Sequence, residues 1–359
     1  MPRFHPLKIK RIDRETPDCV RVTLDVPAEL RETFRFAPGQ YLTFRRQHAG
    51  EELRRSYSLC SSPLDEEWQV AIKKVPEGRF SSLAIEALRT GETLDVMPPA
   101  GHFSPTLHPA QARQYVFFAA GSGITPVFSI LKTVLLTEPN SRVTLLYGNR
   151  GRNSIILKEA LEALKNRFLS RLSLYHILSR EQGDTDLLFG RLDAAKTQQF
   201  LTALLPPAQI DEAFICGPED MIYEVRDALS AAGVAAEKIH FELFTTKSSQ
   251  QKATKRATSP PAGTDDTHSQ VTVQLDGTKR VLEMSYYGDT ILDALLTTGA
   301  DAPYSCKNGM CSTCRARVTE GQAAMDVNYS LSETEVAKGY VLTCQARPTS
   351  ATVQVDFDQ

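Results

Sequence analysis

The sequence predicts a multidomain protein with an antiparallel β-barrel, then an α/β domain with a parallel sheet, then a C-terminal α+β domain. The first reason is that 359 residues are many for a single core. The second is a change of pattern, from closely spaced short strands to strands that alternate with helices beyond about residue 113. The third is the polar stretch 246–268, which has no large apolar side chain and separates the α/β segment from a last block of strands.

The β-barrel is expected at residues 1–106. Val20, Val22, Leu24 and Val26 alternate with period two, which is typical of a half-buried strand. Further strands are expected at 41–44, 56–60 and 68–72. The turn residues Pro38-Gly39 and those of 98–101 separate or end these strands, so a small antiparallel barrel is the natural interpretation.

Two stretches of the barrel carry side chains suited to a phosphorylated, flat cofactor. Side chains alternate along a strand, so Arg55 and Tyr57 are expected on one face and Ser58 on the opposite face. On the first face, the arginine can bind a phosphate while the aromatic ring lies on the flat cofactor. Gly78, Ser81 and Ser82 stand at the start of a predicted helix, where free backbone N–H groups attract anions. The simpler alternatives are a solvated strand face and an ordinary serine N-cap.

The α/β domain is expected at residues 107–245. Strands are predicted at 115–120, 143–147, 172–178, 213–216 and 239–244, and helices at 155–168 and 220–232. After the first strand comes the turn Gly121-Ser-Gly123-Ile-Thr125-Pro126. Thr125 as N-cap and Pro126 as the first helical residue would start a helix whose free N–H groups face a pyrophosphate.

Two other strand ends of this domain point to a nicotinamide dinucleotide. Ligands bind at the carboxyl ends of parallel strands, so a small thiol in Cys216-Gly217-Pro218 suits the nicotinamide end; a buried core cysteine is the alternative. The exit of the 143–147 strand offers Arg150 and Arg152 and no carboxylate to a ribose 2′ position. Acidic residues there would indicate NADH, so we expect NADPH, with NADH as the alternative.

After a flexible linker at 246–268, the last domain is expected at residues 269–359, and it contains the most specific motif. Cys306, Cys311 and Cys314 lie in one short loop and Cys344 follows 29 residues later, which is the C-x4-C-x2-C…C spacing of plant-type [2Fe–2S] proteins. Thiolates also suit zinc, but zinc ribbons pair two short C-x2-C knuckles. The spacing therefore favours a [2Fe–2S] cluster as the metal centre.

Composition limits the remaining function classes. The net charge of −2 argues against nucleic acid as a general partner, and no apolar run approaches the length of a membrane span. The cysteines outside the cluster motif are Cys19, Cys60 and Cys216, an odd number without a disulfide pattern. We therefore expect a cytoplasmic protein.

Four features, taken in order, resemble the ferredoxin–NADP reductase superfamily fused to a C-terminal plant-type ferredoxin. They are the Arg55-Ser-Tyr57-Ser58 segment, the glycine-containing turn at 121–126, the Cys216-Gly-Pro strand end and the cysteine motif. The resemblance covers nearly the whole chain. It implies a flavin-binding barrel, an NAD(P)-binding domain and a β-grasp ferredoxin domain.

The resemblance also implies roles for single residues. Arg55 binds the flavin phosphate, Tyr57 stacks on the isoalloxazine and Ser58 hydrogen-bonds near its N5. Gly78, Ser81 and Ser82 form the second flavin-phosphate segment. The turn that binds the nicotinamide nucleotide, called the nucleotide turn below, contains Gly121, Gly123, Thr125 and Pro126. Cys216 lies beside the nicotinamide, while Glu242 and Phe244 approach the flavin. FAD is expected, with FMN as the alternative.

These features imply an electron-transfer reductase that passes electrons from NADPH through FAD and the [2Fe–2S] cluster to a protein. We expect the reductase component of a multicomponent oxygenase, in particular a di-iron oxygenase that epoxidises the ring of an aromatic acyl-CoA thioester. One alternative is another acceptor, such as a hybrid-cluster protein or another oxygenase. A second alternative is a non-catalytic iron–sulfur redox sensor, which would not need the hydride-accepting residues.

Overall fold

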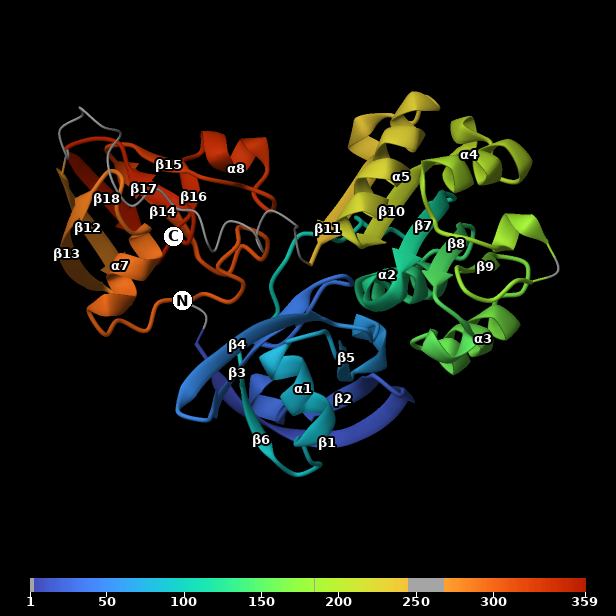
Figure 1. Cartoon of the computed structure of the whole chain (residues 1–359), viewed down its shortest axis with the longest axis horizontal. Helices are drawn as coiled ribbons and strands as arrows, with labels where there is room; N and C mark the ends of the chain where they lie inside the picture. Colours follow the sequence, from blue (N-terminus) through green and yellow to red (C-terminus); the bar gives the residue numbers. More distant parts are fainter. Residues whose placement is uncertain (1–2, 184, 245–267) are drawn as a thin grey trace. The chain divides into compact units, whose positions relative to one another are not determined.

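The computed structural model of the chain describes residues 3–183, 185–244 and 268–359. Residues 4–53 and 57–244 form one compact unit, and the second contains Arg3, residues 54–56 and the C-terminal residues 268–359. Figure 1 shows a main sheet in each of the three parts of the sequence. The predicted linker 246–268 lies outside the described residues except for His268, which opens a strand.

The first sheet is antiparallel, with the strand order β4-β3-β6-β1-β2-β5. A bridge between Leu59, just after β4, and Val70 of β5 brings its two outer strands together, so the predicted barrel is confirmed. Helix α1 (Arg79–Glu86) follows β5. The strands are β1 (His5–Thr16), β2 (Cys19–Asp25), β3 (Tyr41–His48), β4 (Glu51–Ser58), β5 (Trp68–Lys73) and β6 (Thr93–Val96).

The second sheet is parallel throughout, as predicted, with the order β11-β10-β7-β8-β9. Its strands are β7 (Gln114–Ala120), β8 (Arg142–Asn149), β9 (Leu172–Leu178), β10 (Glu212–Gly217) and β11 (Ile239–Leu243). The helices are α2 (Ile124–Thr137), α3 (Lys158–Arg167), α4 (Ala194–Ala203) and α5 (Glu219–Ala231). After β7 the chain forms β8 and β9 on one side of that strand. It then returns to form β10 and β11 on the other side. In open α/β sheets a ligand binds outside the carboxyl ends of two strands that are arranged in this way, and this place is called the crevice below.

Two predicted helix starts are wrong, for identifiable reasons. Thr125 is not an N-cap, because a 3₁₀ turn at Gly121–Gly123 leads directly into α2 at Ile124. Pro126 therefore lies inside the first turn, where its missing N–H costs little. Helix α3 begins at Lys158 rather than 155, because Leu157 is left-handed (φ 58°) and buried, and its N–H donates to Glu15 of β1 at 3.0 Å.

The third sheet is mixed, with the order β13-β12-β18-β14-β16 and a parallel pair β12–β18. The buried side chains of α7 (Ile291–Thr297) pack on it, as expected for the β-grasp α+β domain. Its strands are β12 (His268–Leu275), β13 (Thr278–Ser285), β14 (Arg315–Glu320), β16 (Tyr340–Leu342) and β18 (Thr352–Asp356). Beside them lie the pair β15 (Ala323–Met325) and β17 (Ala346–Pro348) and helix α8 (Glu333–Ala337).

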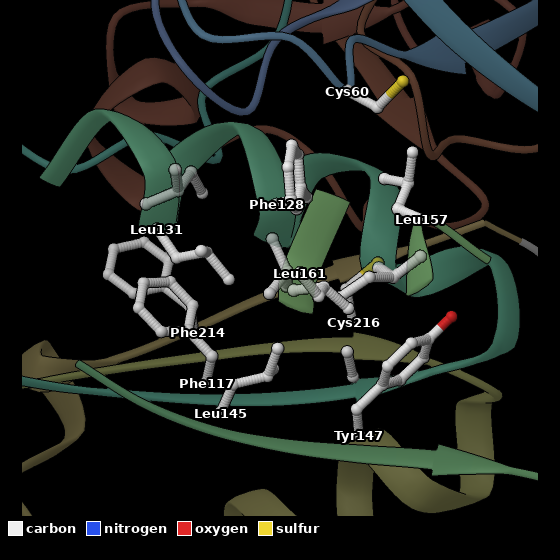
Figure 2. Packing of buried hydrophobic residues seen from close by; sticks show 14 of the residues in the cluster. Cys60, Phe117, Phe128, Leu131, Leu145, Tyr147, Leu157, Leu161, Phe214 and Cys216 are labelled. Carbon is white, nitrogen blue, oxygen red and sulfur yellow. The ribbon is translucent and has the colours of Figure 1, made fainter. Parts of the chain in front are cut away.

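A continuous apolar core joins the parallel sheet to α2. Phe117 and Phe214 stack on neighbouring strands with ring centroids 5.4 Å apart. Figure 2 shows these rings near Leu131, with Cys216 and Tyr147 at the other end of the cluster. The same cluster includes Cys19 and Cys60 of the barrel, so the barrel and the parallel sheet share one core.

Polar contacts fix α2 against the barrel as well. The Ser129 hydroxyl donates to the carbonyl of Ser61 at 2.6 Å, and Lys132 pairs with Asp65 at 2.7 Å. The N–H of Gly39 donates to Ser129 at 3.4 Å, and a Cβ on Gly39 would lie 1.8 Å from the carbonyl oxygen of Phe103. This glycine therefore lets the two layers approach closely.

We predict that Gly39→Ala lowers the free energy of unfolding by about 2–4 kcal/mol, because both its φ of 92° and the Phe103 carbonyl oppose a side chain. Gly91→Ala is the matched control: its φ is 89° and nothing lies within 4 Å, so a loss of about 1 kcal/mol is expected. Urea unfolding of the full chain measures both losses. Equal losses would contradict the close-approach explanation.

Candidate functional site

The structure brings together the two barrel segments that the sequence singles out. Arg55 is exposed on β4, and Tyr57 is half-buried two residues later. The Tyr57 ring packs on Phe80 of α1 with centroids 5.7 Å apart, so it lies beside the 78–82 segment. A flat ring and a helix N-terminus thus belong to one region, which suits a flavin nucleotide.

The 78–82 segment is shaped as a tight cradle. Gly78 is the N-cap of α1, and a Cβ there would lie 2.3 Å from the Ser81 hydroxyl. Ser81 is buried; its hydroxyl accepts from Val75 N and donates to Gly78 O. Ser81 therefore braces the loop instead of capping the helix, and the first N–H groups of α1 remain available to an anion. Ser82 is half-buried.

The nucleotide turn and the Cys216 strand end meet at the crevice of the parallel sheet. A Cβ on Gly123 would lie 2.1 Å from the carbonyl oxygen of Cys216, and one on Gly217 would lie 3.2 Å from Ala120 N. Gly121 is left-handed with φ 54°. Only glycines allow the β7 and β10 exits to touch in this way. The residues that the motifs predict, Gly121, Gly123, Thr125, Pro126, Cys216 and Gly217, all lie at these two exits.

A row of side chains runs across the sheet from this crevice. The strand register aligns Glu242 with Cys216, Cys216 with Ala119 and Ala119 with Tyr147. The Ser58 hydroxyl of the barrel donates to Glu242 at 3.3 Å. Ser58, Cys216 and Glu242, predicted from separate motifs, are therefore neighbours, and Phe244 packs against the same core.

Burial keeps this row uncharged. Cys216 is fully buried, and burial followed by the Glu242 charge raises the pKa of its thiol well above the usual value. Glu242 is half-buried; burial raises its pKa to about 8, opposed by the Ser58 hydrogen bond. At pH 7 both groups are mainly protonated.

The structure also identifies residues near the nucleotide turn that the motifs did not reveal. Lys73, at the end of β5, places its ammonium 3.9 Å from where a Gly121 Cβ would stand, and it pairs with Asp18 at 3.7 Å. This cation comes from the barrel, so no local pattern in the α/β segment could indicate it. Tyr147 donates to the carbonyl of Gly121 at 3.0 Å.

The expectation that no carboxylate faces the β8 exit is wrong. Glu181 accepts from Arg152 N at 3.1 Å and pairs with its guanidinium at 3.9 Å. Arg180, which no sequence motif indicates, is bound through its N–H to the carbonyl of Arg150. Arg150 and Arg180 are exposed, and within residues 3–183, 185–244 and 268–359 neither forms an ion pair. Two guanidiniums thus remain at this exit beside one carboxylate that is already engaged.

The four predicted cluster cysteines arrange as two pairs in the third domain. Cys306 contacts Cys311, and Cys314 contacts Cys344. A hydrogen bond from Cys306 lowers the pKa of Cys311 to about 6, and one from Cys314 lowers that of Cys344. Two thiolates for each of two irons is the ligand set of a [2Fe–2S] cluster, so the donors fit this group. Among the described residues, no three His, Cys, Asp or Glu side chains are placed to hold a single metal ion.

The loop around these cysteines turns its backbone inward. Lys307, Gly309 and Ser312 are all left-handed, and the N–H of Asn308 donates to the Cys306 sulfur at 3.3 Å. A Cβ on Gly309 would lie 3.2 Å from Val327. The Gln345 amide donates to the Cys344 sulfur at 3.5 Å. Such N–H donors stabilise negative charge on sulfur.

Comparison with protein families identifies each part of the chain. Residues 6–104 match the oxidoreductase FAD-binding domain, residues 117–227 the oxidoreductase NAD-binding domain and residues 273–349 the 2Fe-2S iron-sulfur cluster binding domain. These matches agree with FAD, a nicotinamide nucleotide and a [2Fe–2S] cluster as cofactors. In the described parts of the chain, no helix combines the length and apolar character needed to cross a membrane.

Similar proteins extend over the whole length. The chain is 44% identical to a subunit of the 1,2-phenylacetyl-CoA epoxidase of Escherichia coli K12, covering 100% of this chain and 99% of that protein. It is 35% identical to the ferredoxin reductase component of the 3-ketosteroid-9-alpha-monooxygenase of Rhodococcus rhodochrous, over 98% and 96%. The fold matches phthalate dioxygenase reductase with a TM-score of 0.57 at 23% identity, over 99% and 98%.

The order of domains, the cofactor motifs and the full-length relatives agree with one another. The chain therefore belongs to the NAD(P)H-dependent flavin and iron–sulfur reductases of the ferredoxin–NADP reductase superfamily, the electron-transfer components of oxygenases.

Proposed function

We propose that this chain is the reductase of an oxygenase that epoxidises the ring of phenylacetyl-CoA. The observation that carries the proposal is the 44% identity with the 1,2-phenylacetyl-CoA epoxidase subunit over the full length of both chains. Identity falls to 35% for a 3-ketosteroid monooxygenase reductase component and to 29% for a glycine betaine monooxygenase reductase subunit. Another oxygenase as acceptor is the second candidate, and these relatives support it less.

We also propose the residue roles. Arg55 and the 78–82 cradle would hold the flavin phosphates, and the Tyr57 ring would lie on the isoalloxazine. Gly121, Gly123, Thr125 and Pro126 would form the pyrophosphate turn, with Lys73 supplying a cation from the barrel. The flavin and the cluster, when bound, supply the conversion of two-electron to one-electron transfer. The side chains bind and orient these groups.

The uncharged row at the crevice supports this assignment. Cys216 is a small neutral thiol at the strand end where the nicotinamide would lie, and Ser58 with protonated Glu242 adds no negative charge. A hydride equivalent carries negative charge, so an ionised carboxylate there would oppose its approach. Burial raises the pKa of Glu242 to about 8 against the opposing hydrogen bond from Ser58, so the protonated form predominates at pH 7.

For the compartment, we propose the cytoplasm. Cys19, Cys60 and Cys216 are buried, unpaired thiols, which suits a reducing environment.

The acceptor is tested by exchanging this chain for its homologue in the Escherichia coli epoxidase. We predict that it supports NADPH-dependent epoxidation of phenylacetyl-CoA by the remaining components. Cys311→Ser is the matched control: it should abolish the cluster spectrum and epoxidation but keep ferricyanide reduction, because Tyr57, Ser58 and the 78–82 cradle belong to the other compact unit. An active cluster with no epoxidation would favour the second candidate, and loss of flavin in Cys311→Ser would show that the parts are not independent.

We predict a preference for NADPH over NADH of at least about 10-fold in kcat/KM, because Arg150 and Arg180 offer charge-assisted hydrogen bonds to a 2′-phosphate. Arg150→Ala should remove most of that preference by raising KM for NADPH alone. Arg142→Ala, at the opposite end of β8, should leave it unchanged. Equal kcat/KM for the two nucleotides in the unaltered chain would contradict the proposal.

We predict that the free energy of unfolding falls as pH rises from about 4.5 to about 8, in part because of Glu242. Its pKa is raised by burial, so the folded state holds a proton that the unfolded state releases in this window, and the stabilisation is lost as pH passes the folded pKa. Glu242→Gln cannot ionise and should lose less stability between pH 5 and 8. Urea midpoints at both pH values measure the difference, and identical pH dependence would exclude a raised pKa.

A further inference from the structure

Gln345, which follows the fourth cluster cysteine, is a polar side chain buried beside the cysteine loop. It lies between β16 and β17 and is 4% exposed. Its backbone is held on both sides, because its N–H donates to the Leu342 carbonyl at 2.8 Å and its carbonyl accepts from Asp326 N at 3.0 Å. A Cβ on Gly309 would lie 3.3 Å from Gln345 Cγ, so the side chain packs directly on the loop.

The side-chain nitrogen of Gln345 joins the two segments that carry the cluster cysteines. It donates to the carbonyl of Lys307 at 2.9 Å and to the Cys344 sulfur at 3.5 Å. A carbonyl only accepts, so the nitrogen of this amide, and not its oxygen, faces Lys307. The second hydrogen of the same nitrogen serves the sulfur. Gln345 thereby links the loop that holds three thiols to the segment that holds the fourth.

The same nitrogen lies where it can affect the charge of the cluster. Reduction adds one negative charge to a [2Fe–2S] cluster, and hydrogen bonds to the sulfurs are among the factors that set its reduction potential. A donor that faces the Cys344 sulfur stabilises the reduced form more than the oxidised form. Because Gln345 is buried, water does not weaken this interaction.

We propose that Gln345 is a positioning residue of the [2Fe–2S] cluster that raises its reduction potential by donating to Cys344 and joins the two ligand segments through the Lys307 carbonyl. The inference concerns the affinity of the cluster for an electron. It is therefore independent of which oxygenase accepts that electron.

The test is Gln345→Met in the full chain with flavin and cluster bound, because methionine has a similar length and no N–H. The equilibrium constant for reduction of the cluster should fall about 10-fold, as expected for loss of one hydrogen bond to a charged group. For a one-electron couple this is a fall of about 59 mV in the midpoint potential. A redox titration followed by electron paramagnetic resonance of the reduced cluster and by flavin absorbance measures both cofactors, and the flavin potential should not change.

Gln270→Met is the matched control, because it makes the same change at an exposed residue of β12 in the same domain and should alter neither potential. An unchanged cluster potential in Gln345→Met would overturn the inference. Equal shifts in the two variants would overturn it too, since the effect would then not come from the bond to Cys344.

A second measurement uses the unaltered chain, so it decides the question even if Gln345→Met does not retain a cluster. The protein is labelled with glutamine that carries ¹⁵N only in its side-chain amide. Among the described residues, Gln345 is the glutamine whose side chain bonds a cluster cysteine. Pulsed electron paramagnetic resonance of the reduced cluster should therefore detect a ¹⁵N coupling, and its absence would contradict the proposed hydrogen bond.

Discussion

The contact between Gly123 and the Cys216 carbonyl is the constraint on which the rest of the site depends. A Cβ at position 123 would lie 2.1 Å from the carbonyl oxygen of Cys216, so only glycine fits at this point of the turn. Because β7 and β10 touch there, the turn that precedes α2 and the Cys216 thiol lie at one crevice. The strand register then fixes Glu242 on one side and Tyr147 on the other. One close backbone approach therefore sets the positions of residues that come from four different strands.

The barrel takes part in the same arrangement through residues that reach across to the parallel sheet. Ser58 donates to Glu242, Lys73 stands near Gly121, and Glu15 accepts the N–H of Leu157 before α3. Helix α2 is held by Ser129 and Lys132 on its barrel-facing side. Such contacts make the barrel and the parallel sheet one compact unit, so that a flavin group in one part and a nucleotide in the other would be held at a set distance.

The sequence predicted best what is encoded locally. The cysteine spacing indicates a cluster because one loop must place three thiols, and the Gly121 turn indicates a nucleotide because its two glycines lie together at a strand end. Lys73 and Glu181 carried no such signal. Their surroundings arise when segments far apart in the chain meet, and a lysine at a strand end is common. The helix start at Thr125 was mistaken for a related reason, since a threonine before a proline resembles a cap, whereas the preceding 3₁₀ turn had already begun the helix.

Two opposite electrostatic environments follow from these local structures. At the carboxyl ends of β10 and β11, burial raises the pKa of Cys216 and of Glu242 and favours their neutral forms. At the cysteine loop, hydrogen bonds from Cys306 and from Thr313 lower the pKa of Cys311 and favour thiolate, the form that binds iron. Both sets of cysteines are nearly buried, so burial alone does not decide their ionisation. In the cluster loop the thiols act in pairs, because the hydrogen bond from Cys306 lowers the pKa of Cys311 while it raises the pKa of Cys306 itself. Cys216 lies instead among apolar side chains of the core.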